Sequence, residues 1–181
     1  MNKVTNTEEY WMGIVDKVAE ASTCRVNVGC VLMKHFQIVG TGYVGSVRGD
    51  HHCDDIGCIL VETDIHGSSE KNHSCINTMH AELNAVLKCH VRDQLFAFCT
   101  MQPCLRCLQA MLQIGVKIIV YQKPYRDIWR DKYIAETQVV FDMHEYEEGN
   151  ELFASKGIPY TKGNRLFEGR DTDKTFVDWW L

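Results

Sequence analysis

The stretch LFAFCTMQPCLRCLQAMLQIGVKIIVYQ, residues 95–122, contains two apolar runs with a helical pattern between them. LFAFCT (95–100) and KIIVYQ (117–122) are short and rich in apolar, aromatic or β-branched residues, which is typical of buried strands. Residues 104–115 between them are predicted to form a helix. A strand, a helix and a second buried strand indicate an α/β fold in which helices cover a sheet.

The residues before this stretch add further elements of the same kind. Residues 7–22 have apolar residues at helical spacing, with Thr7 as a candidate cap, and predict a first helix. VGCVLM and QIVGTGYVG predict a hairpin over about residues 28–44. A helical pattern returns from His80 to about His90. The order of strands and helices therefore continues the α/β architecture toward the N-terminus.

Two parts of the chain do not follow this pattern. Residues 45–79 form a 35-residue irregular segment, and a loop of this length is expected to be functional or to be held by something. Residues 126–146 are interpreted as an insertion, and residues 149–163 as a further helix and strand. We therefore expect a single domain over residues 1–163, followed by a tail at 164–181.

Composition limits the classes of function. With 181 residues, 45% of them hydrophobic, the chain can bury a substantial core. The net charge is −5 and no Lys/Arg run exceeds two, which argues against a polynucleotide-binding surface but not against a small anionic substrate. Glu8 and Glu9 interrupt any N-terminal signal sequence, and no window reaches transmembrane length, so we expect a cytoplasmic protein. In that compartment the nine cysteines are expected to be reduced thiols, metal ligands or core residues.

Three residues have the spacing of metal ligands. MQPCLRCLQ, residues 101–109, puts Cys104 and Cys107 on the first turn of a helix, where both thiols share one face. His80 begins the preceding helix, and the packing of strand–helix units is expected to bring the two helix starts together. One histidine and two cysteines would leave an open fourth position on a tetrahedral zinc ion, as in a catalytic site.

Glu82 lies two residues after His80 and is expected to flank the metal without binding it. There it would act as a catalytic acid/base that takes a proton from zinc-bound water and returns it to the substrate. The pattern H-x-E…P-C-x-x-C is the signature of zinc nucleobase deaminases. The alternatives are a redox Cys-x-x-Cys pair and a purely structural zinc site, in which Glu82 would have no role.

Several further motifs resemble those of one known family, the cytidine and deoxycytidylate deaminase-like zinc enzymes, and most closely its deoxycytidylate (dCMP) deaminases. The resemblance covers about residues 8–126 and rests on STCRVNVGCVL, GTGYVGS, HHCDDIGC, HSCINTMHAELNAV, PCLRCLQAMLQIGVKIIVY and PYRD. It implies a three-layer αβα fold with a mixed five-stranded sheet covered by helices. It also implies a hydrolase that converts dCMP to dUMP and ammonia, which supplies dUMP for dTMP synthesis in pyrimidine nucleotide biosynthesis.

The resemblance assigns a further set of residues to substrate binding. Backbone N–H groups near Ala81 and Cys104 would hold the base, and Tyr125 would lie against the cytosine ring, where stacking contributes about 1–3 kcal/mol. The HAELNA run adds Asn84 as a substrate-binding candidate. The phosphate needs cations, and the candidates for its grip are Arg25, Arg48 and Arg126.

One position departs from the family. The usual motif Gly-Tyr-Asn-Gly here becomes Gly-Tyr-Val-Gly, with Val44 in place of an asparagine that bonds to the substrate sugar. Valine has no side-chain donor or acceptor. Either another residue supplies the contact, or the substrate differs at the sugar or base.

Several remaining thiols and a histidine suggest a second metal site in the long loop. The preferred ligand set is Cys24, Cys53, Cys58 and Cys75, with His73 as a substitute, and many family members carry a comparable structural zinc. Such an ion would close the loop and offset its entropy. The alternative is a set of scattered reduced thiols, which is the interpretation for the cysteines in apolar runs: Cys30, Cys89 and Cys99.

The resemblance also implies a homohexamer, allosteric activation by dCTP with Mg²⁺ and inhibition by dTTP. The first alternative function is a deaminase of dCTP, cytidine, a modified dCMP or an adenosine in RNA. The second is a non-catalytic zinc-binding module that senses nucleotides, which Glu82 argues against because a sensor needs no proton shuttle.

Overall fold

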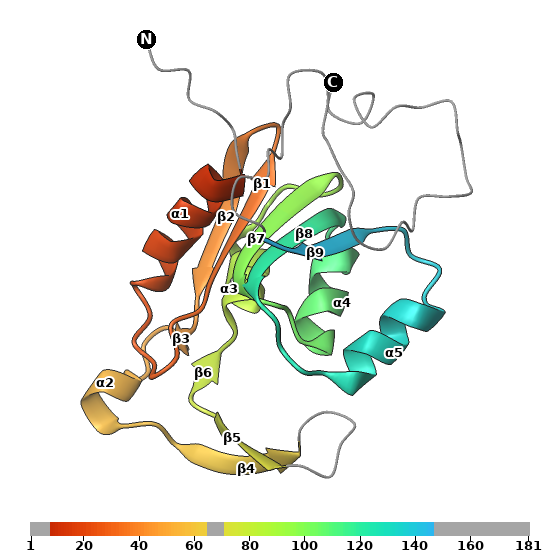
Figure 1. The fold of residues 1–181 in the computed structure, drawn as a ribbon. Helices are drawn as coiled ribbons and strands as arrows, with labels where there is room; N and C mark the ends of the chain where they lie inside the picture. Colours follow the sequence, from red (N-terminus) through yellow and green to blue (C-terminus); the bar gives the residue numbers. More distant parts are fainter. Residues whose placement is uncertain (1–7, 65–70, 147–181) are drawn as a thin grey trace, which may run out of the picture.

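The computed structural model describes residues 8–64 and 71–146. Figure 1 shows a twisted central sheet with helices on both sides and an arm that extends away from it. The elements in chain order are α1 (Glu8–Ala19), β1 (Gly29–Lys34), β2 (Gln37–Tyr43), β3 (Gly45–Ser46), α2 (Cys53–Ile56), β4 (Leu60–Asp64), β5 (Lys71–Cys75), β6 (Thr78–Met79), α3 (Ala81–Lys88), β7 (Leu95–Met101), α4 (Leu105–Gln113), β8 (Val116–Lys123), α5 (Ile128–Glu136) and β9 (Asp142–Glu145).

The central sheet has five strands in the order β2-β1-β7-β8-β9. Strand β1 pairs antiparallel with β2 and β7, whereas β8 pairs parallel with β7 and β9. The predicted three-layer αβα architecture with a mixed five-stranded sheet is therefore confirmed. The predicted hairpin is also confirmed, and its turn consists of His35 and Phe36, which both have positive φ angles.

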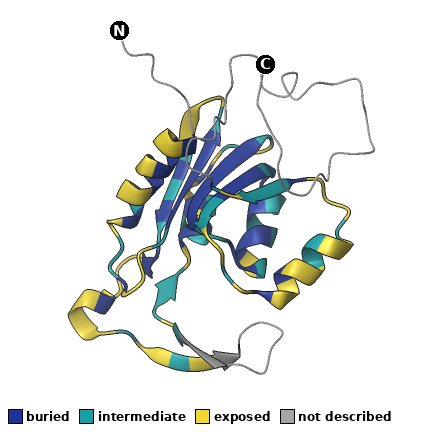
Figure 2. Ribbon diagram, in the orientation of Figure 1, coloured by how far each residue is buried: buried dark blue, intermediate teal, exposed yellow. Residues whose placement is uncertain are grey.

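Two hydrophobic clusters, one on each face of the sheet, form the core. Strand residues 95–100 are all buried because helices cover both faces, which explains their continuous apolar pattern. Helix α1 packs through Trp11, Met12 and Val15 on one face, and α3 and α4 pack on the other. Figure 2 shows the buried strands at the centre and the exposed outer sides of α1 and α5. As predicted, three cysteines are core residues: Cys30, Cys89 and Cys99.

A close approach between β2 and α3 depends on one glycine. A Cβ atom added to Gly42 would overlap the Ala81 carbonyl oxygen and the Ala85 nitrogen. Only glycine therefore allows this strand to touch the first turn of α3. The consequence concerns the site directly, because His80 immediately precedes that turn.

The segment 45–79 is not a featureless loop. Its ends pair as the short ladder β3–β6, and its middle forms the hairpin β4–β5, which extends away from the sheet (Figure 1). Helix α2 lies between these two pairs in the chain. The arm thus leaves the body beside β2 and returns through β6 directly into His80.

The interpretation of residues 126–146 as an insertion was wrong. They form α5 and β9, and β9 is the fifth strand of the sheet, parallel to β8. Strand β9 has no apolar run because it lies at an edge, where its residues are only partly buried. The predicted cap Thr7, the helix and strand at 149–163 and the tail at 164–181 lie outside the described residues.

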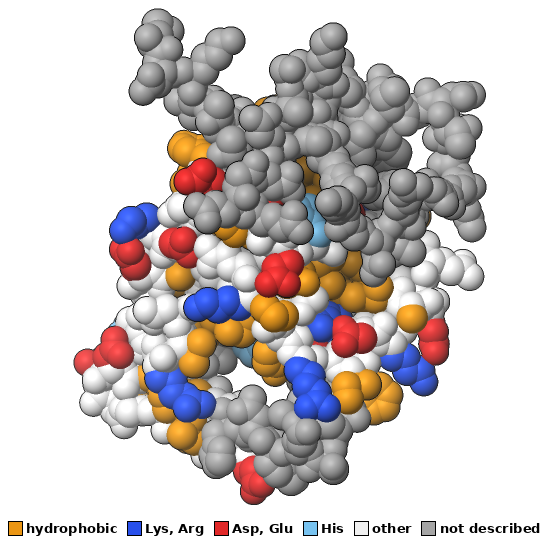
Figure 3. Space-filling view, viewed as in Figure 1, with side chains coloured by type: hydrophobic (Ala, Val, Ile, Leu, Met, Phe, Trp, Pro, Cys, Tyr) orange, Lys and Arg blue, Asp and Glu red, His pale blue; other side chains and the backbone are white. Residues whose placement is uncertain are grey.

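Every helix among the described residues is too short or too polar to cross a membrane. On the face drawn in Figure 3, Lys and Arg side chains of the described residues are scattered among acidic and apolar ones. This distribution agrees with the net charge of −5 in giving that face no continuous basic stripe.

Candidate metal centre and substrate cavity

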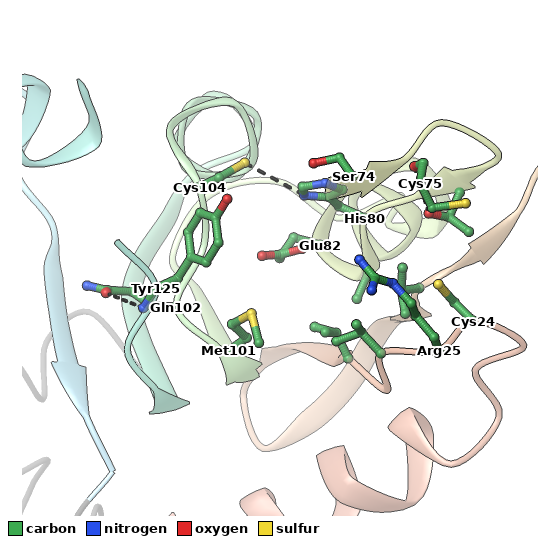
Figure 4. Close-up of a pocket in the computed structure, with 15 residues that line it drawn as sticks. Cys24, Arg25, Ser74, Cys75, His80, Glu82, Met101, Gln102, Cys104 and Tyr125 are labelled. Atoms are coloured by element: carbon green, nitrogen blue, oxygen red, sulfur yellow. Dashed lines mark hydrogen bonds between the residues drawn. The ribbon is translucent and has the colours of Figure 1, made fainter. Parts of the chain in front are cut away.

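Two helix starts bring one imidazole and two thiols together. His80 is the N-cap residue of α3, Cys104 is the N-cap residue of α4, and Cys107 lies one turn into α4. His80 Nδ1 is 3.7 Å from Cys104 Sγ (Figure 4) and 3.3 Å from Cys107 Sγ. Neither N-cap side chain caps its own helix, because both turn toward the shared centre.

The donor set fits a zinc ion. One ligand atom from each of these three residues lies within 4.8 Å of the others, and within the described ranges no further His, Cys or carboxylate belongs to the group. An imidazole nitrogen and two thiolates are ligands that zinc prefers, and three protein ligands leave a tetrahedral position for water. The positive ends of two helices also stabilise anions at this point.

The two thiols differ in pKa, which decides how readily each binds a cation. Hydrogen bonding from Cys107 and then from His80 lowers the pKa of Cys104 to about 4, so this thiol is ionised at neutral pH. The same hydrogen bond to Cys104, together with burial, raises the pKa of Cys107. Cys104 therefore offers a thiolate to a cation, whereas Cys107 would have to lose its proton when it binds one.

Glu82 lies beside this group on the first turn of α3 and is only 4% exposed. Burial raises the pKa of its carboxyl group, since a buried site disfavours the charged form. It lines the same cavity as His80 and Cys104 but does not belong to the ligand group. It is therefore placed as a neighbour of the metal rather than as a ligand.

A cavity of about 300 Å³ opens over the metal centre. In Figure 4, Tyr125 approaches from one side and Arg25 from the other, with Glu82 between them. The Tyr125 backbone N–H donates to Gln102 Oε1 at 3.1 Å, which ties the loop after β8 to the end of β7. The cavity thus combines an aromatic ring, a cation and the metal ligands within one space.

The structure divides the predicted substrate-binding residues into two groups. Ala81, Arg25 and Tyr125 line the cavity. Arg48 and Arg126 are exposed and are not among the residues that line it. Asn84 also lies outside the lining, because its Nδ2 donates to the Tyr43 carbonyl oxygen at 2.9 Å and so joins α3 to β2.

Part of the cavity wall is apolar. Val44, the residue that departs from the family motif, lines the cavity together with Val26, Val28 and Met101. Ser74 and Thr78 add two hydroxyl groups from the returning side of the arm. The sequence pattern did not single out Ser74 and Thr78, because only the folded arm brings them to the cavity.

The second group of cysteines also converges. The sulfur atoms of Cys24, Cys53 and Cys58 lie within 4.8 Å of one another, and Cys53 Sγ is 3.6 Å from Cys75 Sγ. Burial raises the pKa of Cys53 to about 12. The side chain of His73 lies outside the described part of the structure, although its backbone pairs with Glu62.

The two candidate metal groups share a wall. Cys24 and Cys75 line the substrate cavity as well as contributing to the second cysteine group. The returning side of the arm therefore reaches the cavity, through the end of β5 and through β6, which precedes His80.

A mixed five-stranded sheet between helices, with histidine and two cysteines at two helix starts, defines the class of zinc-binding deaminase folds. Residues 5–123 match the family described as the cytidine and deoxycytidylate deaminase zinc-binding region. The chain belongs to this family, as its motifs predicted.

Individual relatives agree with this placement. The chain is 32% identical over 123 residues to ComE operon protein 2 of Bacillus subtilis, which covers 65% of this chain and 60% of that protein. It is 32% identical over 123 residues to deoxycytidylate deaminase of Saccharomyces cerevisiae, covering 66% of this chain and 38% of that protein. The similarity to these relatives thus spans less than two thirds of their length.

A solved structure extends the similarity over more of the chain. The dCMP deaminase of cyanophage S-TIM5, in complex with dCMP and dUMP, is 26% identical and superposes with a TM-score of 0.58. The comparison covers 77% of this chain and 96% of that one. The match therefore includes almost the whole phage domain.

Proposed function

We propose that this protein catalyses the zinc-dependent hydrolytic deamination of dCMP to dUMP and ammonia. One observation carries the proposal: a single cavity is lined by His80 and Cys104 of the zinc-type ligand group, by the buried residue Glu82 and by Arg25. The names of the yeast relative and of the cyanophage structure support the same substrate.

The proposed chemistry assigns zinc to His80, Cys104 and Cys107. When bound there, zinc lowers the pKa of water to about 7 and so supplies the nucleophile at neutral pH. Glu82 would take one proton from the attacking water and deliver it to ring N3 of cytosine while the water oxygen bonds to C4. It would deliver the second proton of that water to the C4 amino group, which would leave as ammonia.

The remaining cavity residues would orient the nucleotide. The ring of Tyr125 stacks on the base, and backbone N–H groups near Ala81 and Cys104 hold its polar edge. Arg25 binds the phosphate, since it is the one predicted arginine among the described residues that line the cavity. In this scheme Arg48 and Arg126 have no substrate contact, and Asn84 acts only on the backbone of β2.

A second candidate function has one observation in its favour. Val44 and its apolar neighbours offer no hydrogen bond where the family places an asparagine. This favours a cytosine nucleotide that is modified at the sugar or base, processed by the same chemistry. An apolar contact surface discriminates between analogues by only about 1–3 kcal/mol per methylene, so this part of the wall accepts both substrates.

A substrate panel tests the proposal. The loss of the cytosine chromophore is followed with dCMP, dCTP, deoxycytidine, cytidine and a sugar-modified dCMP, together with the zinc content per chain. We expect turnover of dCMP with the highest kcat/KM. Turnover of dCTP or cytidine without turnover of dCMP would refute the monophosphate assignment. Bound zinc without turnover of any of these compounds would instead indicate a nucleotide-sensing module.

We further propose a second, structural zinc ion at Cys24, Cys53, Cys58 and Cys75. The convergence of these thiols at the base of the arm supports it. Cys53→Ser should lower the zinc content by one equivalent while the active-site ion stays bound. Cys89→Ser is the matched control, because Cys89 is also buried but belongs to the core. Unchanged zinc stoichiometry in Cys53→Ser would refute the second site.

The remaining parts of the proposal come from the family resemblance. They are a homohexamer in the cytoplasm, activation by dCTP with Mg²⁺, inhibition by dTTP, and a role in supplying dUMP for dTMP synthesis. Sedimentation with and without dCTP and Mg²⁺ tests assembly. Initial rates at low dCMP, with either nucleotide added, test regulation; equal rates would remove the allosteric part.

A further inference from the structure

One buried carboxylate accepts hydrogen bonds from the first turns of two helices beside the cavity. Asp127 is 0% exposed and is the N-cap residue of α5, where its Oδ1 accepts from the Arg130 backbone N–H at 3.0 Å. Its Oδ2 accepts from the Leu105 backbone N–H at 2.8 Å, at the first position of α4. A residue from the loop after β8 thus supplies the cap that α4 lacks.

The reason for this arrangement lies in the metal centre. An N-cap side chain ordinarily accepts a hydrogen bond from the first turn of its own helix. Cys104 occupies that position in α4, but its sulfur points to His80. The Cys104 sulfur cannot bind the metal and also accept from its own helix. The backbone N–H groups at the start of α4 therefore need an acceptor from another part of the chain. Asp127 is that acceptor.

Arg130 connects the same two loops from the other side. Its side chain is 3% exposed, and its Nη1 donates to the Pro103 carbonyl oxygen at 3.2 Å and to the Tyr125 carbonyl oxygen at 2.8 Å. Its Nε and Nη2 both donate to Asp131 Oδ1. One guanidinium therefore holds the residue before a metal ligand and the residue proposed to stack on the base.

We propose that Asp127 and Arg130 are positioning residues: Asp127 sets the position of Cys104 for metal binding, and Arg130 sets the position of Tyr125 for the base. Neither side chain lines the cavity, so both act through these neighbours. The Tyr125 part rests on the proposed function, whereas the Cys104 part depends only on metal binding.

If Asp127 and Arg130 only stabilised the fold, their replacement would have different effects from those of the proposed positioning role. Burying two charged groups costs stability unless each is fully hydrogen-bonded. Three of the groups that they bond, on Leu105, Pro103 and Tyr125, lie at the two loops that frame the cavity. If the pair served stability only, its loss would act like any other loss of folding free energy. If it sets positions, the loss appears in zinc affinity and KM while the protein is still folded.

Asp127→Asn tests the metal half. The amide NH2 replaces one of the two carboxylate oxygens, so either the Leu105 or the Arg130 N–H group would face a donor. We expect the zinc affinity, measured by competition with a chelator, to fall by about 10–100-fold, as for other groups that orient metal ligands. The measurement needs no turnover, so it decides this half even if dCMP is not the substrate.

Two controls separate position from stability. Val15→Ala removes a buried methyl pair on the opposite face of the sheet and lowers stability without touching the site. Asp131→Asn removes an exposed carboxylate from the same guanidinium. Zinc affinity should stay within about twofold of wild type in both. An equal loss in Val15→Ala, or no loss in Asp127→Asn, would overturn the assignment of Asp127.

Arg130→Lys tests the substrate half. A single ammonium group cannot hold both carbonyl oxygens and Asp131 in the geometry of the guanidinium. We expect KM for dCMP to rise by about tenfold, with a smaller change in kcat, because stacking on Tyr125 is weakened. Unchanged KM, or a loss confined to kcat, would overturn the assignment of Arg130.

Discussion

Replacing Glu82 with glutamine separates proton transfer from metal binding. The amide has nearly the same shape, which matters because Glu82 is only 4% exposed and a smaller residue would leave a cavity. Its low exposure also limits rescue by bulk water. A positioned acid/base contributes about 10²–10⁴-fold to a rate. Because this one group would serve the attacking water, the ring nitrogen and the leaving amine, we expect the upper end, about 10⁴-fold in kcat or about 5.5 kcal/mol.

The assay combines turnover with metal analysis. The rate is the loss of cytosine absorbance at saturating dCMP, and the zinc content is measured on the same preparation. Glu9→Gln is the control, because it makes the same chemical change at an exposed position on α1. Zinc should be retained in both variants. A Glu82→Gln rate within tenfold of wild type would refute the shuttle role, and loss of zinc would mean that Glu82 supports the metal instead.

Three further perturbations test other parts of the structure. Arg25→Ala should raise KM for dCMP by about 10–100-fold but leave turnover of deoxycytidine unchanged, since only the phosphate is lost as a contact; kinetics with both substrates would show it. Gly42→Ala should destabilise the protein by about 1–3 kcal/mol or more and lower zinc affinity, because the new methyl group would displace Ala81 and the start of α3; thermal unfolding and chelator competition measure this. Burial raises the pKa of Asp142, so keeping this group ionised in the folded protein lowers stability at pH values above that pKa. Below the ordinary pKa of an aspartate the group is protonated in both states, and this cost is absent. Thermal unfolding should therefore show a higher Tm for Asp142→Asn at neutral pH and no increase at about pH 3.

The metal centre was predictable because its information is local. Cys104 and Cys107 are three residues apart, a spacing that places both on one helix face. His80 and Glu82 are two residues apart at another helix start, so both lie near the same helix end. The buried strands were predictable for a similar reason, since coverage on both faces requires continuous apolar runs. In each case the physical requirement acts between residues that are close in the chain.

The lining of the cavity was less predictable because it depends on contacts between residues that are far apart in the chain. Asn84 has a motif position that suggests a ligand contact, yet its amide bonds to the backbone of Tyr43, 41 residues away. Strand β9 was missed because an edge strand needs no apolar alternation. Asp127 did have a signal, since an aspartate before a helical pattern is a typical N-cap. Nothing local indicated that its second oxygen would cap another helix.

The arm at 45–79 links the two candidate metal groups in a way that bears on catalysis. An extended hairpin of two strands is only marginally stable in water, so its base needs additional contacts to have a defined position. The cysteine group supplies them at the point where Cys24 and Cys75 face the cavity. From Cys75 the chain runs through β6 into His80, so a displacement at the base of the arm would reach a candidate metal ligand within five residues. A second metal at this point would therefore fix the positions of the residues in the cavity wall and lower the conformational entropy of the arm. For this reason, loss of zinc in Cys53→Ser should raise KM even when the active-site ion is retained.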